Sequence, residues 1–150
     1  MSKAEVAALR LYTSSTFRLI NGPLRGNVTP HPLAVTTLQI SNALKKMRAI
    51  DMSSDVIFQT KFLWRGMRNT IPGEEFMLKG GAELACMSTS TSLEVVAGYA
   101  KSQAPLLFRI KVDTPMQLGA NITWLSIYPG YPPRPRPRLQ LCCLTSKTKS

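Results

Sequence analysis

Residues 84–101 read LACMSTSTSLEVVAGYAK, and this stretch joins three kinds of local structure. Its apolar beginning, Leu84 to Met87, is typical of a short strand. The serines and threonines at 88–92 have the composition with which helices begin. Thr91 and Glu94 have the spacing of a capping box, so we predict a helix over 93–101. A strand, a polar connection and a helix in this order indicate a mixed α and β protein.

Further strands are expected on both sides of that stretch. Residues 56–64 are rich in β-branched and aromatic types and predict a strand that ends at Arg65-Gly66. Apolar and polar residues alternate over 106–112, which is the pattern of a half-buried strand. Residues 122–127 predict the last strand of the ordered part.

The N-terminal third is predicted to be helical. Residues 3–20 are rich in Ala and Leu, and Asn21-Gly22-Pro23 follows them as a stop signal. A second helix is indicated by residues that recur at steps of four and three and so share one face, namely Leu33, Thr37, Ile40, Leu44 and Met47. Helices first and strands afterwards, with one helix between them, indicate the α+β class.

Composition narrows the possible functions. The chain has 150 residues, enough for one domain, and a net charge of +11. Such a charge attracts polyanions without sequence preference, and no nucleic-acid-binding motif accompanies it. Three cysteines and one histidine provide neither a zinc motif nor a disulfide framework, so we expect no metal. Without an apolar run that predicts a signal peptide or a membrane span, we expect a soluble, cytoplasmic protein.

The C-terminal segment differs from the rest. Asp113 is the last acidic residue, so the 37 residues from 114 to 150 contain no carboxylate. Four prolines between 132 and 137 remove backbone donors and disfavour a central strand. We therefore expect 131–150 to be a basic tail, rich in Pro and Arg and disordered.

Several segments, taken in order, resemble the arginine-directed mono-ADP-ribosyltransferases. The matching pieces are Leu11-Tyr12-Thr13, Ile20-Asn21, Leu24-Arg25, Leu63-Trp64-Arg65-Gly66, Met87-Ser88-Thr89-Ser90, Val96-Ala97, Tyr99-Ala100 and Trp124-Leu125-Ser126-Ile127-Tyr128-Pro129-Gly130. The resemblance covers roughly residues 9–130. It implies an incomplete domain over 1–130, with N-terminal helices packed on a mostly antiparallel β core. It also implies NAD as substrate and an arginine of an acceptor protein as the group modified.

The chemistry of NAD cleavage suits the residues that carry the resemblance. An arginine held at a strand end offers a planar fork of donors for phosphate and ribose oxygens, and Arg65 occupies that position. Gly66 would let the cofactor approach the backbone. The resemblance implies that Ser88 orients the catalytic carboxylate and that Thr89 and Ser90 stabilise the site. Two simpler interpretations stay open: a surface arginine that ends a strand, and a Ser/Thr run that only caps a helix.

The resemblance fails where the family has its Glu-x-Glu. The second Glu of that motif bonds the ribose and offsets the charge of an oxocarbenium ion, and the motif should follow Gly130. The chain continues instead with Tyr131-Pro132-Pro133-Arg134. The other acids considered as substitutes are not placed by the family pattern, namely Glu74, Glu75, Glu83, Glu94 and Asp113. Loss of one preorganised electrostatic group typically costs ~10²–10³ in rate, so we expect an inactive or impaired transferase.

Two further expectations follow from the altered C-terminus. The sheet should be truncated there, which would leave a neighbouring strand with an open edge. The change of composition after Gly130 suggests a shifted reading frame, alternative splicing or a gene-model error, which sequencing of the transcript tests. The alternative function is a non-catalytic module that binds NAD or a protein partner.

Overall fold

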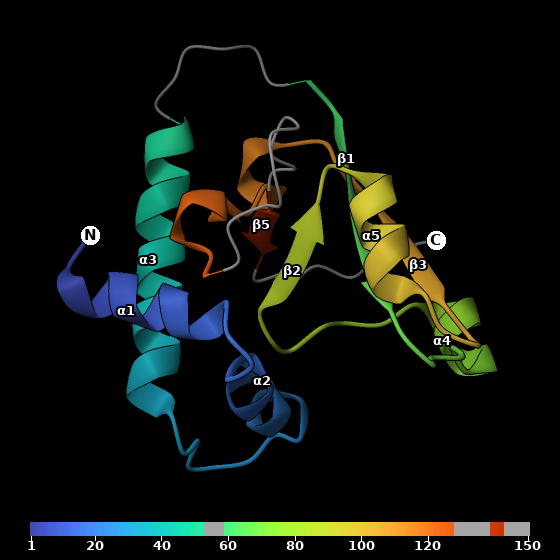
Figure 1. Ribbon diagram of the computed structural model, residues 1–150, viewed down its shortest axis with the longest axis horizontal. Coiled ribbons are helices and arrows are strands. Elements are labelled where there is room, and N and C mark those ends of the chain that lie inside the picture. The colour runs from blue at the N-terminus through green and yellow to red at the C-terminus, as the bar shows by residue number, and fades with distance from the viewer. Residues whose placement is uncertain (53–58, 128–138, 143–150) are drawn as a thin grey trace.

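The computed structural model describes residues 1–52, 59–127 and 139–142. Five helices and five strands are assigned in these residues. They are α1 (Lys3–Tyr12), α2 (Phe17–Arg25), α3 (Ala34–Met52), β1 (Lys61–Met67), α4 (Glu74–Lys79), β2 (Met87–Ser90), α5 (Leu93–Ala100), β3 (Leu106–Val112), β4 (Ala120–Asn121) and β5 (Leu139–Cys142). The three N-terminal helices gather on one side of the strands, as Figure 1 shows. The predicted α+β class is confirmed.

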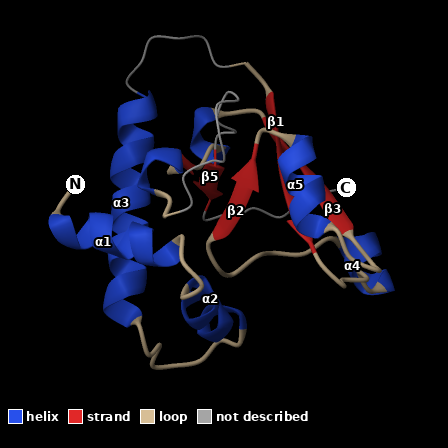
Figure 2. Ribbon diagram, viewed as in Figure 1, coloured by secondary structure: helices blue, strands red, loops and turns tan. Residues whose placement is uncertain are grey.

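The strands form one antiparallel sheet in the order β3-β1-β2-β5-β4. The longest pairing joins β1 and β3, from Lys61 opposite Val112 to Met67 opposite Leu106. Because side chains alternate along a strand, Leu63 and Met67 share one face with Arg65, while Trp64 and Gly66 share the other. Helix α5 packs against that second face, and Figure 2 shows it beside β1 and β3.

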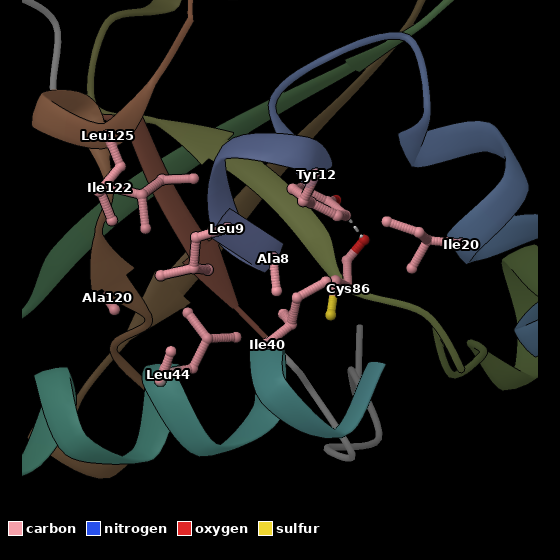
Figure 3. Close-up of a cluster of buried hydrophobic side chains, with 11 residues drawn as sticks. Ala8, Leu9, Tyr12, Ile20, Ile40, Leu44, Cys86, Ala120, Ile122 and Leu125 are labelled. Atoms are coloured by element: carbon pink, nitrogen blue, oxygen red, sulfur yellow. Dashed lines mark hydrogen bonds between the residues drawn. The ribbon is translucent and has the colours of Figure 1, made fainter. Parts of the chain in front are cut away.

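The larger hydrophobic core lies between the N-terminal helices and the sheet (Figure 3). Leu9 of α1 and Ile40 of α3 are both fully buried. The predicted helical face is confirmed, because Leu44 is also buried and Leu33 and Met47 pack against the cluster. The sheet side of this core is made by Cys86, Ala120, Ile122 and Leu125.

The N-terminal helical segment is two helices, where the sequence predicted one over 3–20. Helix α1 ends at Tyr12 because two hydroxyls take up its last carbonyls: Thr13 Oγ1 donates to Arg10 O and Ser14 Oγ donates to Leu11 O. Helix α2 then continues past the predicted stop and contains Pro23. Pro23 has no N–H to donate and its ring crowds the carbonyl four residues earlier, which agrees with the end of the helix two residues later at Arg25.

Several predicted strands differ from those observed. The sequence placed a strand at 84–87, whereas β2 spans Met87–Ser90. Strand β1 does not end at Arg65 but continues to Met67, and the predicted residues 56–58 lie outside the described part of the chain. The strand predicted over 122–127 is wrong, because Thr123–Leu125 form a 3₁₀ turn. Asn121 Oδ1 accepts the Thr123 N–H at 3.1 Å and so starts a turn in place of a strand.

The basic tail contributes a strand, contrary to the expected disorder. β5 pairs with β2, with Leu141 opposite Ser88, and also with β4. Strand β2 therefore has β1 on one side and β5 on the other, so this strand does not have the open edge that was expected of a neighbour of the missing strand. Backbone pairing requires no particular side chain, which allows residues without the family motif to fill this place in the sheet. The rest of 131–150 lies outside the described residues.

Candidate functional site

Arg65 and Ser88, predicted to share one site, are in contact. Arg65 Nη1 donates a hydrogen bond to the backbone oxygen of Ser88 at 3.2 Å. The Arg65 side chain is 15% exposed. Burial lowers the pKa of this guanidinium, but an arginine stays charged at any physiological pH. The adjacent strands β1 and β2 thus place a mostly buried cation beside the Ser-Thr-Ser segment.

A second arginine and a carboxylate accompany Arg65. Arg25, in the last turn of α2, binds Glu83 through two hydrogen bonds, Nε to Oε1 at 3.0 Å and Nη2 to Oε2 at 2.8 Å. The same Oε2 lies 3.8 Å from Arg65 Nη2. Burial raises the pKa of Glu83, but the hydrogen bonds from Arg25 and from the Ala85 N–H, together with the charges of both arginines, hold it below its ordinary value. The carboxylate is therefore ionised and lies against two cations.

Tyr12 connects Ser88 to the N-terminal helices. The Tyr12 hydroxyl donates to the backbone oxygen of Cys86 at 2.8 Å, and Ser88 Oγ donates to the Tyr12 oxygen at 3.4 Å. Asn21 Nδ2 donates to the same Cys86 oxygen at 3.0 Å. Burial raises the pKa of Tyr12 above 10.0, although hydrogen bonds from Ser88 and Asn21 lower it. The phenol is consequently neutral and positions the serine hydroxyl.

Thr89 and Ser90 belong to strand β2 and are both buried. Thr89 is 2% exposed and Ser90 is 5% exposed. Ser90 Oγ accepts the N–H of Ser92, and Ser92 Oγ accepts the N–H of Val95 and caps α5. The cap is therefore Ser92, and the predicted Thr91–Glu94 capping box is not the observed cap. Part of the Ser/Thr run thus has the structural role that the sequence left open.

Gly66 is required by helix packing. A Cβ at this position would lie 2.8 Å from the backbone oxygen of Val96 and 2.8 Å from Ala100 Cβ, both in α5. Real Cβ atoms do not approach other atoms so closely, so the absence of a side chain lets α5 lie on β1. The sequence predicted a glycine for cofactor approach, and the structure supplies a separate reason for it.

A cavity of about 490 Å³, here called the Arg65 cavity, brings most of these residues together. Its wall includes cations, hydroxyl groups and aromatic rings, namely Arg25, Arg65, Arg68, Ser88, Thr89, Ser90, Thr123, Ser126, Tyr12, Phe17, Trp64 and Tyr99, together with Asn21 and Gly66. All five predicted site residues line it. No carboxylate lines it among the residues that the structure describes. Cations bind phosphate and aromatic faces stack on rings, so the cavity suits a nucleotide.

A second cavity, also about 490 Å³, adjoins the first and is here called the Phe108 cavity. Arg25 and Arg65 line both cavities, whereas Glu83 lines only the second. Its other walls are mainly apolar and include Phe76, whose ring meets that of Phe108 edge-on with centroids 6.0 Å apart. The arginine pair therefore stands at the boundary between the two cavities.

None of the five acids considered as substitutes for the missing glutamate lines the Arg65 cavity. Asp113 pairs with Lys111 at 3.0 Å, and Glu75 pairs with Lys79 on the exposed helix α4. Glu74 is exposed on α4, and Glu94 is exposed on α5. Glu83 alone approaches Arg65, and its oxygens already accept hydrogen bonds from Arg25 and from the Ala85 N–H.

Sequence reasoning missed the Arg25–Glu83 pair and the role of Tyr12. The resemblance had included Leu11-Tyr12-Thr13 and Leu24-Arg25 without assigning them roles. These contacts join residues 58 and 76 positions apart, so no local pattern reveals them. The only available signal was the clustering of Tyr12, Asn21 and Arg25 within two successive helices.

Comparisons with known proteins bear on the fold. No protein-family model and no curated protein matches the sequence. Among solved structures, exoenzyme S from Pseudomonas aeruginosa, in complex with human 14-3-3 protein beta and bound to carba-NAD, is similar with a TM-score of 0.60 and 22% identity. The match covers 93% of this chain and 61% of that one. The likeness shows that the two share a fold, and the expected ADP-ribosyltransferase type of α+β architecture is confirmed.

None of the helices in the part of the chain that the structure describes has the length and apolar character needed to cross a membrane.

Proposed function

We propose that this chain is an ADP-ribosyltransferase-type domain that binds NAD in the Arg65 cavity and is inactive or severely impaired in ADP-ribosyl transfer. The main support is the contact between Arg65 and Ser88 in a cavity that also contains aromatic rings. The structure of exoenzyme S with carba-NAD adds support, because a protein of the same fold holds a close analogue of NAD.

Different residues of the cavity would bind different parts of NAD. The guanidinium groups of Arg65 and Arg25 would bind the pyrophosphate, for which planar N–H forks are suited. Trp64 and Tyr99 offer faces on which a nicotinamide or adenine ring can stack. The Ser88 hydroxyl, held by Tyr12, would lie beside the ribose.

Chemical transfer requires more than this set of residues. Breaking the bond between nicotinamide and ribose develops positive charge on the ribose, which the family stabilises with a carboxylate. No carboxylate lines the Arg65 cavity among the described residues, and the sequence has none after Asp113. Without it we expect a rate at least ~10²–10³ below that of a complete site. Arginine as the acceptor group and a protein as the acceptor rest on the resemblance.

Calorimetric titration with NAD tests the binding step. We expect saturable binding that is lost in Arg65→Gln and retained in Arg109→Gln. Arg109 is the control, because it lies in the neighbouring strand β3 and does not line the Arg65 cavity, and its guanidinium lies over the Phe62 ring. Equal weakening by the two substitutions would indicate general charge attraction, and an Arg65 variant that binds NAD normally would contradict the proposal.

Transfer of labelled ADP-ribose to agmatine, a small arginine substitute, tests the chemical step. We expect transfer near the uncatalysed level while NAD still binds. That result would leave the chain as a non-catalytic NAD-binding module, the alternative named above. Robust transfer that survives substitution of every candidate acid, by Gln at Glu74, Glu75, Glu83 and Glu94 and by Asn at Asp113, would show that the missing carboxylate is not needed.

A further inference from the structure

Two arginines from distant parts of the chain converge at the boundary of the Arg65 cavity. Arg25 comes from the end of α2 and Arg65 from the middle of β1, and both line the cavity. Like charges repel: burial is the main cause of the lowered pKa of Arg65, and the proximity of Arg25 lowers it a little further. Long side chains also lose rotamer freedom when they are held in one place. Some other group must therefore offset the repulsion and fix the pair.

Glu83 is placed to do both. Its carboxylate binds Arg25 through two hydrogen bonds, and its Oε2 lies 3.8 Å from Arg65 Nη2. Arg25 is the more exposed of the two arginines, with a side chain 43% exposed, so it depends more on a partner for a defined position. A two-point contact fixes the plane of a guanidinium as well as its place.

The carboxylate itself is anchored to the backbone that leads into β2. Glu83 Oε1 accepts the N–H of Ala85 at 3.1 Å, and Ala85 is 3% exposed. Strand β2, which begins at Met87, carries Ser88. The position of Arg25 is thereby tied to the same strand that holds the Ser88 oxygen bound by Arg65. Glu83 lines only the Phe108 cavity, on the far side of the arginines from the proposed NAD site.

We propose that Glu83 is a positioning residue, which holds Arg25 beside Arg65 so that both guanidinium groups bind the pyrophosphate of one dinucleotide. This role rests on the proposed function. Glu83 acts through Arg25 and does not touch the ligand. Its effect should consequently be seen with ligands that contain a pyrophosphate and should depend on the presence of Arg25.

The test compares Glu83→Gln, Arg25→Gln and the double variant by calorimetric titration with NAD, ADP and nicotinamide. Glutamine keeps the shape and the acceptor for Ala85 but removes the charge and the two-point contact. We expect affinity for NAD and ADP to fall about tenfold in Glu83→Gln, the size of one charge-assisted contact. Nicotinamide, which has no phosphate, should bind as it does to the native chain. In the Arg25→Gln background, adding Glu83→Gln should change affinity less than about twofold.

Two further variants test whether the effect requires Glu83 in particular and the planar group of Arg25. Glu75→Gln breaks an exposed ion pair with Lys79 on α4 and should leave all three affinities unchanged. Arg25→Lys keeps the charge, loses the planar fork and should weaken NAD and ADP without any change at Glu83. Thermal unfolding of each variant shows whether it is folded. If Glu83→Gln does not fold, Glu83→Asp, which keeps the charge but shortens the reach to Arg25, replaces it in the same titrations and should weaken NAD and ADP but not nicotinamide.

Several results would overturn the role. Tighter binding of NAD by Glu83→Gln would make Glu83 an electrostatic competitor of the ligand. Equal loss for nicotinamide would indicate general damage to the cavity. A full effect in the Arg25→Gln background would show that Glu83 acts without Arg25. Failure of the native chain to bind NAD or ADP would overturn the proposed function and this role together, whereas normal binding by Glu83→Gln would overturn the role alone.

Discussion

Gly66→Ala should destabilise the fold, whereas Gly98→Ala should stabilise it. The added methyl group at position 66 would meet the Val96 backbone oxygen and Ala100 Cβ at 2.8 Å each. Neither neighbour is the flexible end of a side chain, so α5 must move away from β1. Overpacking of this kind costs about 1–3 kcal/mol. Replacing a strand glycine recovers about 0.5–1 kcal/mol of that, which leaves a net loss between about 0 and 2.5 kcal/mol, centred near about 1 kcal/mol.

Gly98 is the matched control within α5. A Cβ there meets nothing within 4 Å, and the residue is exposed. The change to alanine removes only the helix penalty of glycine, about 0.5–1 kcal/mol, and should raise stability by that amount. Urea unfolding followed by circular dichroism measures the free energy of unfolding of each variant.

The opposite expected changes in unfolding free energy distinguish a packing role of Gly66 from a role in ligand binding. If Gly66→Ala unfolds at the same urea concentration as the native chain and yet loses NAD, the glycine serves cofactor approach and the packing explanation is refuted. If both variants are destabilised equally, the contact of α5 with β1 is not as tight as the 2.8 Å distances imply.

Three more predictions concern the N-terminal helices. Tyr12→Phe removes a buried hydrogen bond to a backbone carbonyl and should cost about 1 kcal/mol of unfolding free energy in urea, whereas Tyr99→Phe, at a side chain 66% exposed, should cost nothing measurable. The hydrogen bond from Lys46 holds the pKa of Glu5 below its ordinary 4.5, so the stability that Glu5 confers is complete above pH 4.5 and is lost as pH falls through the lowered value. Glu5→Gln should therefore make the midpoint of thermal unfolding less dependent on pH in that acidic range. An unchanged dependence would contradict this. Leu44→Ala should lower the free energy of unfolding, measured by denaturant titration, by about 2–5 kcal/mol, whereas Leu38→Ala, at a residue 57% exposed, should lower it by less than about 0.5 kcal/mol. Similar losses would show that α3 does not have one buried and one exposed face.

Predictions from the sequence succeeded where the evidence was periodic. The apolar face of α3 recurs at helical steps over several turns, and the alternation along β3 matches its observed bounds, Leu106–Val112. They failed where one local contact decided the outcome. The hydroxyls of Thr13 and Ser14 end α1, and Asn121 starts a turn where apolar residues suggested a strand.

The candidate site was predictable only in part. Arg65 and Ser88 were expected to converge, and the hydrogen bond between them agrees with that expectation. Their assignment to NAD remains a prediction. The Arg25–Glu83 pair and the contact of Tyr12 with Ser88 could not be anticipated. Each joins an N-terminal helix to the sheet region, and no local sequence pattern predicts how these elements pack against one another.

The sequence alone established one property of this chain, the absence of Asp and Glu from residues 114–150, because a side chain that is not encoded cannot be supplied by folding. Local periodicity likewise established the α+β class, since amphipathic helices and strands must bury their apolar faces. Only the tertiary structure decided that β5 pairs with β2 and that Glu83 lies between two arginines. Strand pairing and long-range ion pairs join residues far apart in the chain, and their geometry exists only once the core has brought the elements together.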